Sequence, residues 1–243
     1  MGGNRLSISS AEFSGPTTDW LGAFFSLHSY RKRVFARLYV LAFLFPGLLL
    51  WTGTGHANPR GGQVVHGDVS IHSRGGNILD IEQRTANAII NWEEFSIDSD
   101  ELTRFQQPSA NAAVLNRVTG GNPTAIHGAL RANGNVFVIN PNGILVGAGG
   151  TIDVHGLVLS TLDVSNGEFL AGGDMVFAGS SGAGVTNLGR VNAIGGDVFL
   201  IGKTVSNSGT ISARNGTVGL AAGEEVLLKE TDSSMGDRVF VRA

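Results

Sequence analysis

The chain of 243 residues has no cysteine, and it is poor in aromatic side chains (7%) and in charged ones (15%). Without cysteine it can form neither a disulfide framework nor a thiolate metal site. What the chain has in excess is glycine, with 36 residues. Each glycine inside a helix costs about 1 kcal/mol relative to alanine, so this content disfavours a helical protein and favours short strands joined by many turns.

The charges are distributed unevenly along the chain. Residues 1–57 carry five basic and two acidic side chains, which leaves twelve basic and eighteen acidic ones for residues 58–243. An acidic chain without a basic cluster argues against nucleic acid as a partner.

The first 57 residues have the pattern of a leader. A basic stretch at Arg31–Arg37 is followed by the 14 mainly apolar residues Leu38–Trp51, and then by small residues up to Ala57. That order predicts a secretory signal peptide, cleaved between Ala57 and Asn58. The alternative is a membrane anchor, but a helix of 14 residues spans about 21 Å, less than the roughly 30 Å of a hydrocarbon core.

The clearest structural signal is an internal period of 20 residues. The recurring pairs are Val185 and Val205, Asn187 and Asn207, Gly189 and Gly209, Val191 and Ile211, Gly196 and Gly216, Val198 and Val218, and Leu200 and Leu220. Self-similarity at this period indicates stacked solenoid coils. Leucine-rich repeats share the period, but here the segments are too rich in glycine and β-branched residues for helical returns. The pattern predicts an all-β, single-stranded, right-handed parallel β-helix in residues 58–243, clearest at 185–223.

The same alignment predicts which side chains face the interior. Val191, Val198 and Leu200 are expected to point inward and to stack on their counterparts in the next coil. Phe199 aligns with Gly219, and a position that accepts either residue does not belong in a tightly packed interior. We therefore expect Phe199, and Phe137 at the matching position of an earlier coil, to face outward under an extra-helical strand pair.

Polar and glycine positions of the repeat predict the corners of the coil. Asn187 and Asn207 are expected to form an amide ladder, in which each side chain bonds its copy one coil away. Gly189 and Gly209 are expected to provide the backbone freedom that such corners need.

From Arg60 onward six segments carry a recognisable pattern: Gly61–Gly67, Ala88–Ile97, Phe105–Ala110, Leu115–Pro123, Val136–Ile144 and Gly156–Asp163. In these segments and in their order the chain resembles the haemagglutination-activity domain at the N-terminus of filamentous-haemagglutinin-type exoproteins, the secreted members of two-partner secretion systems. The resemblance implies a secretion-targeting domain with N-terminal capping strands, recognised by a dedicated outer-membrane transporter with periplasmic docking domains. It implies export to the cell surface or medium in unfolded form, and folding outside the cell.

The resemblance also implies what the whole exoprotein does. Family members act in adhesion, haemagglutination or toxin delivery through a distal passenger that engages a host or bacterial surface receptor. No cofactor is implied.

One short motif has a specific role in that family. The resemblance implies that Asn140, Pro141, Asn142 and Gly143 are needed for productive secretion. Chemically they form a tight turn, because Pro141 fixes φ, Asn140 can bond the backbone ahead, and Gly143 accepts positive φ. Direct recognition by the transporter and formation of a corner both remain open as roles.

A second family motif, Asn-Pro-Asn-Leu, is replaced here. At the equivalent place this chain has Gln106-Gln107-Pro108-Ser109, which resembles the other subgroup of the family. We therefore carry over no partner contact to these residues.

The alternative function is a carbohydrate-active β-helix enzyme. Its site would need carboxylates that converge on one strand face. Asp80 and Glu82 share a face of a predicted strand, as residues two apart do, but ordinary alternation with a solvated side explains them equally well. We predict no catalytic residue.

Candidate metal ligands lack the spacing that metal sites need. Asp98, Asp100 and Glu101 match no calcium-loop pattern and fit an acidic surface loop. The histidines are scattered without paired spacing; they are His66, His72, His127 and His155. We predict no metal.

A third hypothesis is the passenger domain of a single-chain autotransporter, which would need a C-terminal translocator domain, and we identify none in the sequence.

After Leu220 the chain ends at Ala243 without the polar cap that a solenoid end needs. We therefore expect a fragment of a longer exoprotein.

Overall fold

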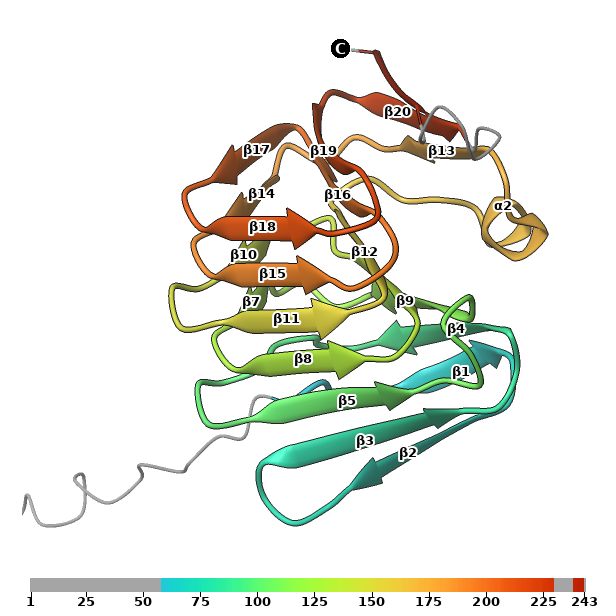
Figure 1. The fold of residues 1–243 in the computed structure, drawn as a ribbon, viewed down its shortest axis with the longest axis vertical. Coiled ribbons are helices and arrows are strands. Elements are labelled where there is room, and N and C mark those ends of the chain that lie inside the picture. Colours follow the sequence, from blue (N-terminus) through green and yellow to red (C-terminus); the bar gives the residue numbers. More distant parts are fainter. Residues whose placement is uncertain (1–57, 230–237, 243) are drawn as a thin grey trace, which may run out of the picture. The chain divides into compact units, whose positions relative to one another are not determined.

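The computed structural model describes residues 58–229 and the backbone of residues 238–242. Short strands wind round a common axis and build three sheets (Figure 1). Sheet 1 contains, in spatial order, β1 (Gln63–His66), β4 (Asn87–Trp92), β6 (Ala113–Val118), β9 (Asn135–Ile139), β12 (Gly156–Ser160), β16 (Val198–Gly202) and β19 (Val218–Ala222). Sheet 2 contains β17 (Thr204–Asn207), β14 (Gly184–Asn187), β10 (Ile144–Val146) and β7 (Thr124–Ile126). Sheet 3 contains β18 (Thr210–Ala213), β15 (Arg190–Ala193), β11 (Thr151–Val154), β8 (Ala129–Ala132), β5 (Leu102–Gln106), β3 (Ile78–Gln83) and β2 (Val69–Ser73).

Each full coil takes one strand from sheet 2, one from sheet 3 and one from sheet 1. The coils are β7-β8-β9, β10-β11-β12, β14-β15-β16 and β17-β18-β19, and equivalent strands pair in parallel. In Figure 1 the parallel strands of sheet 3 run from left to right at the front as the chain rises, so the coil is right-handed. The predicted right-handed parallel β-helix is confirmed.

The register of the last two coils follows the sequence period. Val185 pairs with Val205, Val191 with Ile211, and Leu200 with Leu220. Because strands that are 20 residues apart lie side by side, each coil repeats the side-chain directions of the one before it. The strands from β14 to β19 therefore pair at the 20-residue spacing of the sequence repeat.

The interior of the coil is a continuous aliphatic core. Val191, Val198 and Leu200 are fully buried in it, as predicted. Burying one such side chain contributes about 1.5–3 kcal/mol. Val218 and Leu220 stand in register above this core but are 41% and 48% exposed. Within the described residues no further coil covers them.

The N-terminal end of the coil is closed by two antiparallel strands. β1 pairs antiparallel with β4, and β2 pairs antiparallel with β3. They terminate the parallel ladders of sheets 1 and 3, so the predicted capping strands are confirmed.

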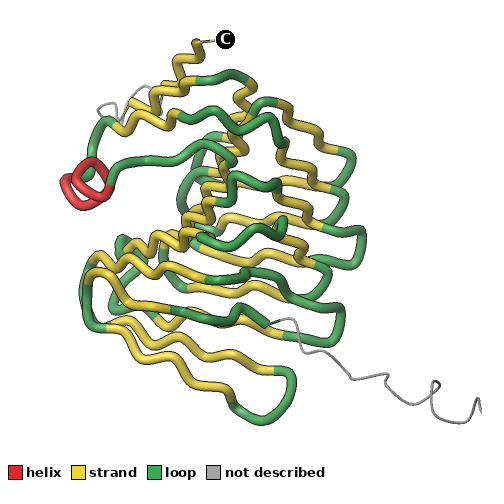
Figure 2. Tube along the Cα trace, turned by 180° about the vertical axis from the view of Figure 1, so that it is seen from behind, coloured by secondary structure: helices red, strands yellow, loops and turns green. Residues whose placement is uncertain are grey.

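An outer layer covers part of sheet 1. The chain leaves the coil after β12, forms helix α2 (Asn166–Ala171) and strand β13 (Met175–Ala178), and returns at β14. β13 joins β20 (Glu225–Lys229) and β21 (Arg238–Arg242) in an antiparallel sheet. Figure 2 shows the helix standing beside the stacked coils. The layer is therefore larger than the predicted strand pair: it has three strands and a helix.

Aromatic side chains join the outer layer to the coil. Phe137 and Phe199 face outward, as predicted, and belong to a second core that includes Phe169 and Phe177. The rings of Phe137 and Phe169 meet edge to face, with centroids 5.3 Å apart and planes at 77°. Such a pair contributes about 0.5–1.5 kcal/mol beyond the area it buries.

The predicted reason for the corner glycines is wrong. The amide ladder itself is confirmed, because Asn187 Nδ2 donates to Asn207 Oδ1 at 2.8 Å. Gly189 and Gly209, however, do not have positive φ. A Cβ on either would collide with backbone of the preceding coil, at Gly147 O for Gly189 and at Gly189 O for Gly209. Glycine is needed there for the close approach of two coils.

Helix content is minimal in the parts of the chain that are described. α2 has six residues and a capping box, in which Ser165 and Glu168 bond each other's backbone N–H groups. In residues 58–229 and 238–242 no helix has the length and apolar character required to span a membrane.

Candidate functional site

The Asn140–Gly143 motif forms the corner between β9 and β10, where the chain turns from sheet 1 to sheet 2. Gly143 N donates to Asn140 O at 3.1 Å and closes a four-residue turn. Gly143 has φ of +115°, which glycine adopts without strain. Asn142 N donates to Asn140 Oδ1 at 2.9 Å, so the first side chain bonds the backbone ahead. The predicted turn chemistry is confirmed.

The side chain of Asn140 is fully buried. Its Nδ2 donates to Asn122 O at 3.0 Å and to Thr124 Oγ1 at 2.9 Å. Both partners belong to the preceding coil. Asn140 therefore joins two coils at the corner, and a shorter side chain would leave buried polar groups unpaired.

The other half of the motif lies at the surface. Pro141 and Asn142 are exposed, and Asn142 Nδ2 donates to Gly120 O at 2.8 Å. Ser181 Oγ donates to Pro141 O at 2.6 Å, so the chain that returns from the outer layer also reaches this corner. The motif thus combines a buried amide that joins two coils with an exposed turn that is hydrogen-bonded to neighbouring segments.

A column of polar contacts links the corner to the N-terminal end of the coil. Asn122 Nδ2 donates to Glu94 Oε1 at 2.7 Å, and Arg60 Nη2 lies 2.7 Å from Glu94 Oε2. Hydrogen bonds to the Glu94 carboxyl hold its pKa below the ordinary value, and the bond from Arg60 has a larger effect than the bond from Asn122. Sequence reasoning missed this column. The Asn122-Pro123 pair, which occurs 18 residues before Asn140-Pro141, was the signal that could have revealed it.

The Gln106–Ser109 segment lies at a different corner, between sheets 3 and 1. Gln107 is buried there, and its Nε2 donates to Gln83 Oε1 at 3.2 Å. Its backbone N donates to Asn133 Oδ1 at 2.7 Å. These contacts hold successive coils together, so the structure does not bring this segment and the Asn140 motif into one site.

The carboxylates considered for catalysis are bound by arginines. Asp80 is 1% exposed. Arg104 forms two hydrogen bonds with it, from Nε to Oδ1 at 2.8 Å and from Nη2 to Oδ2 at 3.0 Å. Arg74 Nε lies 2.5 Å from Asp80 Oδ2. The hydrogen bonds from Arg104 are the main cause that lowers the pKa of Asp80. Glu82 pairs separately with Arg84 at 3.0 Å.

The acidic residues considered for calcium are engaged in loop contacts. Asp98 N donates to Glu101 Oε2 at 2.8 Å, and Asn77 Nδ2 donates to Asp100 Oδ2 at 2.7 Å. Among the residues that the structure describes, no three histidine, aspartate or glutamate side chains are grouped so that they could hold a metal ion.

Two of the four histidines considered as ligands pack against glycines of a neighbouring turn. The His127 ring occupies the space beside Gly147, and the His155 ring the space beside Gly195. His66 and His72 are exposed on the capping strands.

Of the two residues at the predicted cleavage site, the structure describes only Asn58. Ala57 and the leader lie outside the described residues. Asn58 is half-buried, and its Oδ1 accepts a hydrogen bond from Thr103 Oγ1 at 3.0 Å. Cleavage between the two residues stays a prediction.

A family model described as the TPS secretion domain matches residues 56–239. The chain belongs to this family. TPS secretion domains are parts of two-partner secretion exoproteins, which are exported through the outer membrane to the cell surface or medium. The domain targets the protein for that route, and the family is not a family of enzymes.

Curated relatives and solved structures agree with this assignment. A heme/hemopexin-binding protein of Haemophilus influenzae is 37% identical over 205 residues, which is 77% of this chain and 22% of the relative. A second heme/hemopexin-binding protein of that organism is 38% identical over 106 residues, or 44% of this chain and 11% of the relative. The chain thus spans under a quarter of the length of either relative.

Two crystal structures share the fold. The HMW1 secretion domain from Haemophilus influenzae has a TM-score of 0.70 and 35% identity, over 76% of this chain and 50% of that one. The filamentous hemagglutinin secretion domain has a TM-score of 0.52 and 16% identity, over 76% and 68% of the two chains.

Proposed function

We propose that residues 58–243 are the targeting signal that a cognate outer-membrane transporter recognises through periplasmic docking domains. Recognition follows removal of a signal peptide between Ala57 and Asn58. The family match over residues 56–239 supports this role. In this proposal the chain crosses the outer membrane unfolded, and the coils stack outside the cell.

The geometry of the Asn140–Gly143 corner carries the proposal for a specific signal. The turn is closed by bonds within four residues, from Asn142 N to Asn140 Oδ1 and from Gly143 N to Asn140 O. A turn of this local kind can form in an otherwise unfolded chain. The bonds from Asn140 to Asn122 and Thr124 require the preceding coil and form later. The transporter therefore reads the local turn, and the same residues then lock the folded corner.

Export assays with matched asparagine variants test this proposal. The full chain is expressed in its native host together with the cognate outer-membrane transporter, and Asn140→Ala and Asn142→Ala are compared with Asn187→Ala. Asn187 is an equivalent control because it is fully buried, donates to Asn207 Oδ1 at 2.8 Å and accepts from Gly189 N at 3.1 Å. We expect the first two variants to accumulate in the periplasm and Asn187→Ala to reach the medium.

Two results would contradict the proposal. Normal export of both Asn140→Ala and Asn142→Ala would remove the assigned role of the motif. Equal periplasmic retention of Asn187→Ala would show that the corner acts only through the stability of the coil.

The role of the whole exported protein is part of the same proposal. We assign it adhesion or delivery of a distal passenger, with a host or bacterial surface receptor as partner. Both curated relatives are named for binding heme and hemopexin, and this chain matches 22% of the length of one and 11% of the length of the other. The paired state of Asp80 and Glu82 gives no support to the alternative of a carbohydrate-active enzyme.

A further inference from the structure

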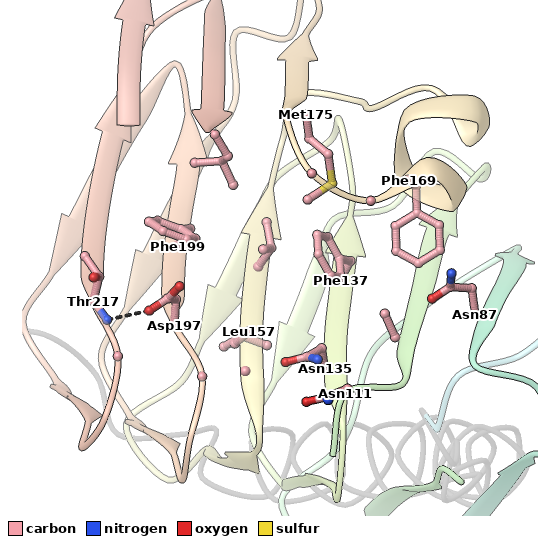
Figure 3. A pocket seen from close by; sticks show the side chains of 18 of the residues that line it. Asn87, Asn111, Asn135, Phe137, Leu157, Phe169, Met175, Asp197, Phe199 and Thr217 are labelled. Carbon is pink, nitrogen blue, oxygen red and sulfur yellow. Dashed lines mark hydrogen bonds between the residues drawn. The ribbon is translucent and has the colours of Figure 1, made fainter. Parts of the chain in front are cut away.

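A cleft of about 770 Å³ lies between the outer surface of sheet 1 and the outer layer. Its floor is built by successive strands from β4 to β16 and by Thr217, next to β19. Its outer wall is built by α2, the loop after it, and β13 (Figure 3). None of the lining residues belongs to the Asn140–Gly143 corner.

Side-chain amides line one lip of the cleft. They come from Asn87, Asn111, Asn135 and Asn215, and Figure 3 shows Asn111 and Asn135 side by side. Asn111 and Asn215 are exposed and Asn87 is half-buried. Within residues 58–229 the amide groups of these three make no hydrogen bond, so each offers two N–H donors and an acceptor oxygen. Vicinal hydroxyl groups of a sugar need that mixture of donors and acceptors.

The opposite side of the cleft is apolar. Phe137, Phe169 and Met175 contribute to it, and Figure 3 shows the two rings turned toward each other beside the methionine. Phe137 is 9% exposed, and Met175 is half-buried. A surface that is apolar on one side and carries a few convergent polar groups on the other is typical of small-ligand sites. The C–H faces of a pyranose ring fit such an apolar side.

The cleft carries no net charge. Its two charged lining residues are Asp197 and Lys229. Asp197 Oδ1 accepts a hydrogen bond from Thr217 N, and Lys229 Nζ lies 3.8 Å from Asp174 Oδ2. A polyanion would find no positive field here, which argues against nucleic acid and sulfated glycans and favours a neutral ligand.

The length of the cleft suits an extended ligand. From β4 to β19 the lining crosses consecutive strands of sheet 1, and strands that lie about 4.8 Å apart give a span of about 24 Å. One sugar residue of an extended glycan has a length close to the strand spacing. Successive sugars can therefore meet equivalent positions on successive coils.

A peptide strand is a poorer fit. The floor strands β6, β9, β12 and β16 are each hydrogen-bonded on both edges, so no edge is open for strand addition. On the opposite wall, Val176 N of β13 donates to Glu168 Oε1, and Ala178 bridges Asp163. These contacts occupy the edge that β13 would offer to a peptide.

From these observations we infer that the cleft binds a neutral oligosaccharide lengthwise, with hydroxyl groups toward the asparagine lip and ring faces toward Phe137 and Met175. The site shares no residue with the Asn140–Gly143 corner. It gives the exported domain a glycan-binding activity of its own.

Calorimetric titration of the exported chain tests the inference. The probes are cellohexaose, maltohexaose and chitohexaose, the corresponding disaccharides, and a heparin hexasaccharide as the charged comparison. We expect saturable binding of at least one neutral hexasaccharide, weaker binding of its disaccharide, and none of the heparin fragment. The double variant Asn111→Ala/Asn215→Ala removes exposed side chains without hydrogen bonds, and we expect it to weaken binding about tenfold. Gln106→Ala removes an exposed amide on sheet 3, outside the cleft, and should leave affinity unchanged.

Three results would overturn the inference. They are absence of saturable binding by every neutral hexasaccharide at millimolar concentration, affinity that the asparagine double variant does not change, and preference for the heparin fragment. Competition by an extended peptide of mixed sequence, with no response to the sugars, would assign the cleft to a protein partner instead.

Discussion

Arg117 of β6 holds Asp163 across 46 residues of sequence, with its Nε 2.9 Å from Oδ1 and 3.1 Å from Oδ2. The same guanidinium donates from Nη2 to Val164 O at 2.8 Å and from Nη1 to Asn166 Oδ1 at 2.9 Å. The Arg117 side chain is 16% exposed. One arginine on the coil therefore fixes the first residues of the insertion that carries α2 and the outer wall of the cleft.

We predict that Arg117→Met loosens the outer layer while the coil stays folded. Methionine keeps the apolar stem but removes the donors, and loss of these charge-assisted bonds should cost about 1–2 kcal/mol of unfolding free energy. Hydrogen exchange at residues 163–171 should become faster, while exchange in β9 and β12 stays slow. Arg84→Met is the control, because the pairs of Arg84 with Asp68 and Glu82 are exposed. Equal hydrogen exchange at residues 163–171 in Arg117→Met and the wild type would show that Arg117 does not hold the outer layer in place.

The repeat explains why much of the coil was predictable from sequence. Two examples are Asn187, which pairs with Asn207, and Phe199, which pairs with a glycine in the next coil. Because each coil repeats the same structural positions, comparing the two residues at one position indicates whether that position lies at a corner, in the interior or on the outside. The ion pair between Arg117 and Asp163 has no equivalent in any other coil that the structure describes. The insertion after β12 belongs to no repeat, and contacts that join distant segments leave no local pattern in a single sequence.

Buried polar residues inside the coil were also beyond prediction. Asn116 is fully buried, accepts a hydrogen bond from Trp92 Nε1 at 2.9 Å, and donates from Nδ2 to Phe137 O at 3.2 Å. The alternation around it, in Ala113–Val118, gives no sign that an amide faces inward. Only the position of the Trp92 ring, one coil away, explains why asparagine is needed there.

The corner motif shows a similar division. The turn geometry of Asn140–Gly143 follows from the intrinsic preferences of proline, asparagine and glycine, so the sequence was sufficient to predict it. The bonds from Asn140 to Asn122 and Thr124 depend on how the preceding coil is placed. Those contacts could be found only in the structure.

We predict opposite outcomes for alanine at two glycines of the coil. In Gly189→Ala the new Cβ meets the carbonyl oxygens of Gly147 and Gly150, and backbone cannot retreat as a flexible side chain can. Such overpacking should cost about 1–3 kcal/mol in urea unfolding. At Gly121 a Cβ would have no atom within 4 Å, and this glycine does not have positive φ. Gly121→Ala should therefore be neutral or stabilise by up to about 1 kcal/mol.

Equal stability of the two alanine variants would contradict the explanation that glycine is needed at position 189 because the neighbouring coil leaves no room for a Cβ. A crystal structure of Gly189→Ala with unchanged coil spacing would have the same meaning.

The last prediction concerns acid stability and Asp80. Its pKa is lowered in the folded protein, chiefly by hydrogen bonds from Arg104, with further contributions from the charges of Arg104 and Arg74. Because the folded pKa lies below the unfolded value of about 3.9, the stabilisation is complete above that value and is lost as pH falls through it toward the folded pKa. Asp80→Asn removes the charge at every pH. It should lower the unfolding free energy by about 2 kcal/mol at pH 7, less than for a fully buried pair because both arginines are partly exposed.

The pH dependence separates this role from simple packing. Stability curves of the wild type and Asp80→Asn should converge as pH falls from about 5 toward 2, because the wild type loses its ion pair there. Glu82→Gln, on the same strand, removes an exposed pair with Arg84 and should change stability by less than about 0.5 kcal/mol at any pH. If the gap between wild type and Asp80→Asn stayed constant over that range, the buried carboxylate would contribute through its shape and hydrogen bonds and not through its charge.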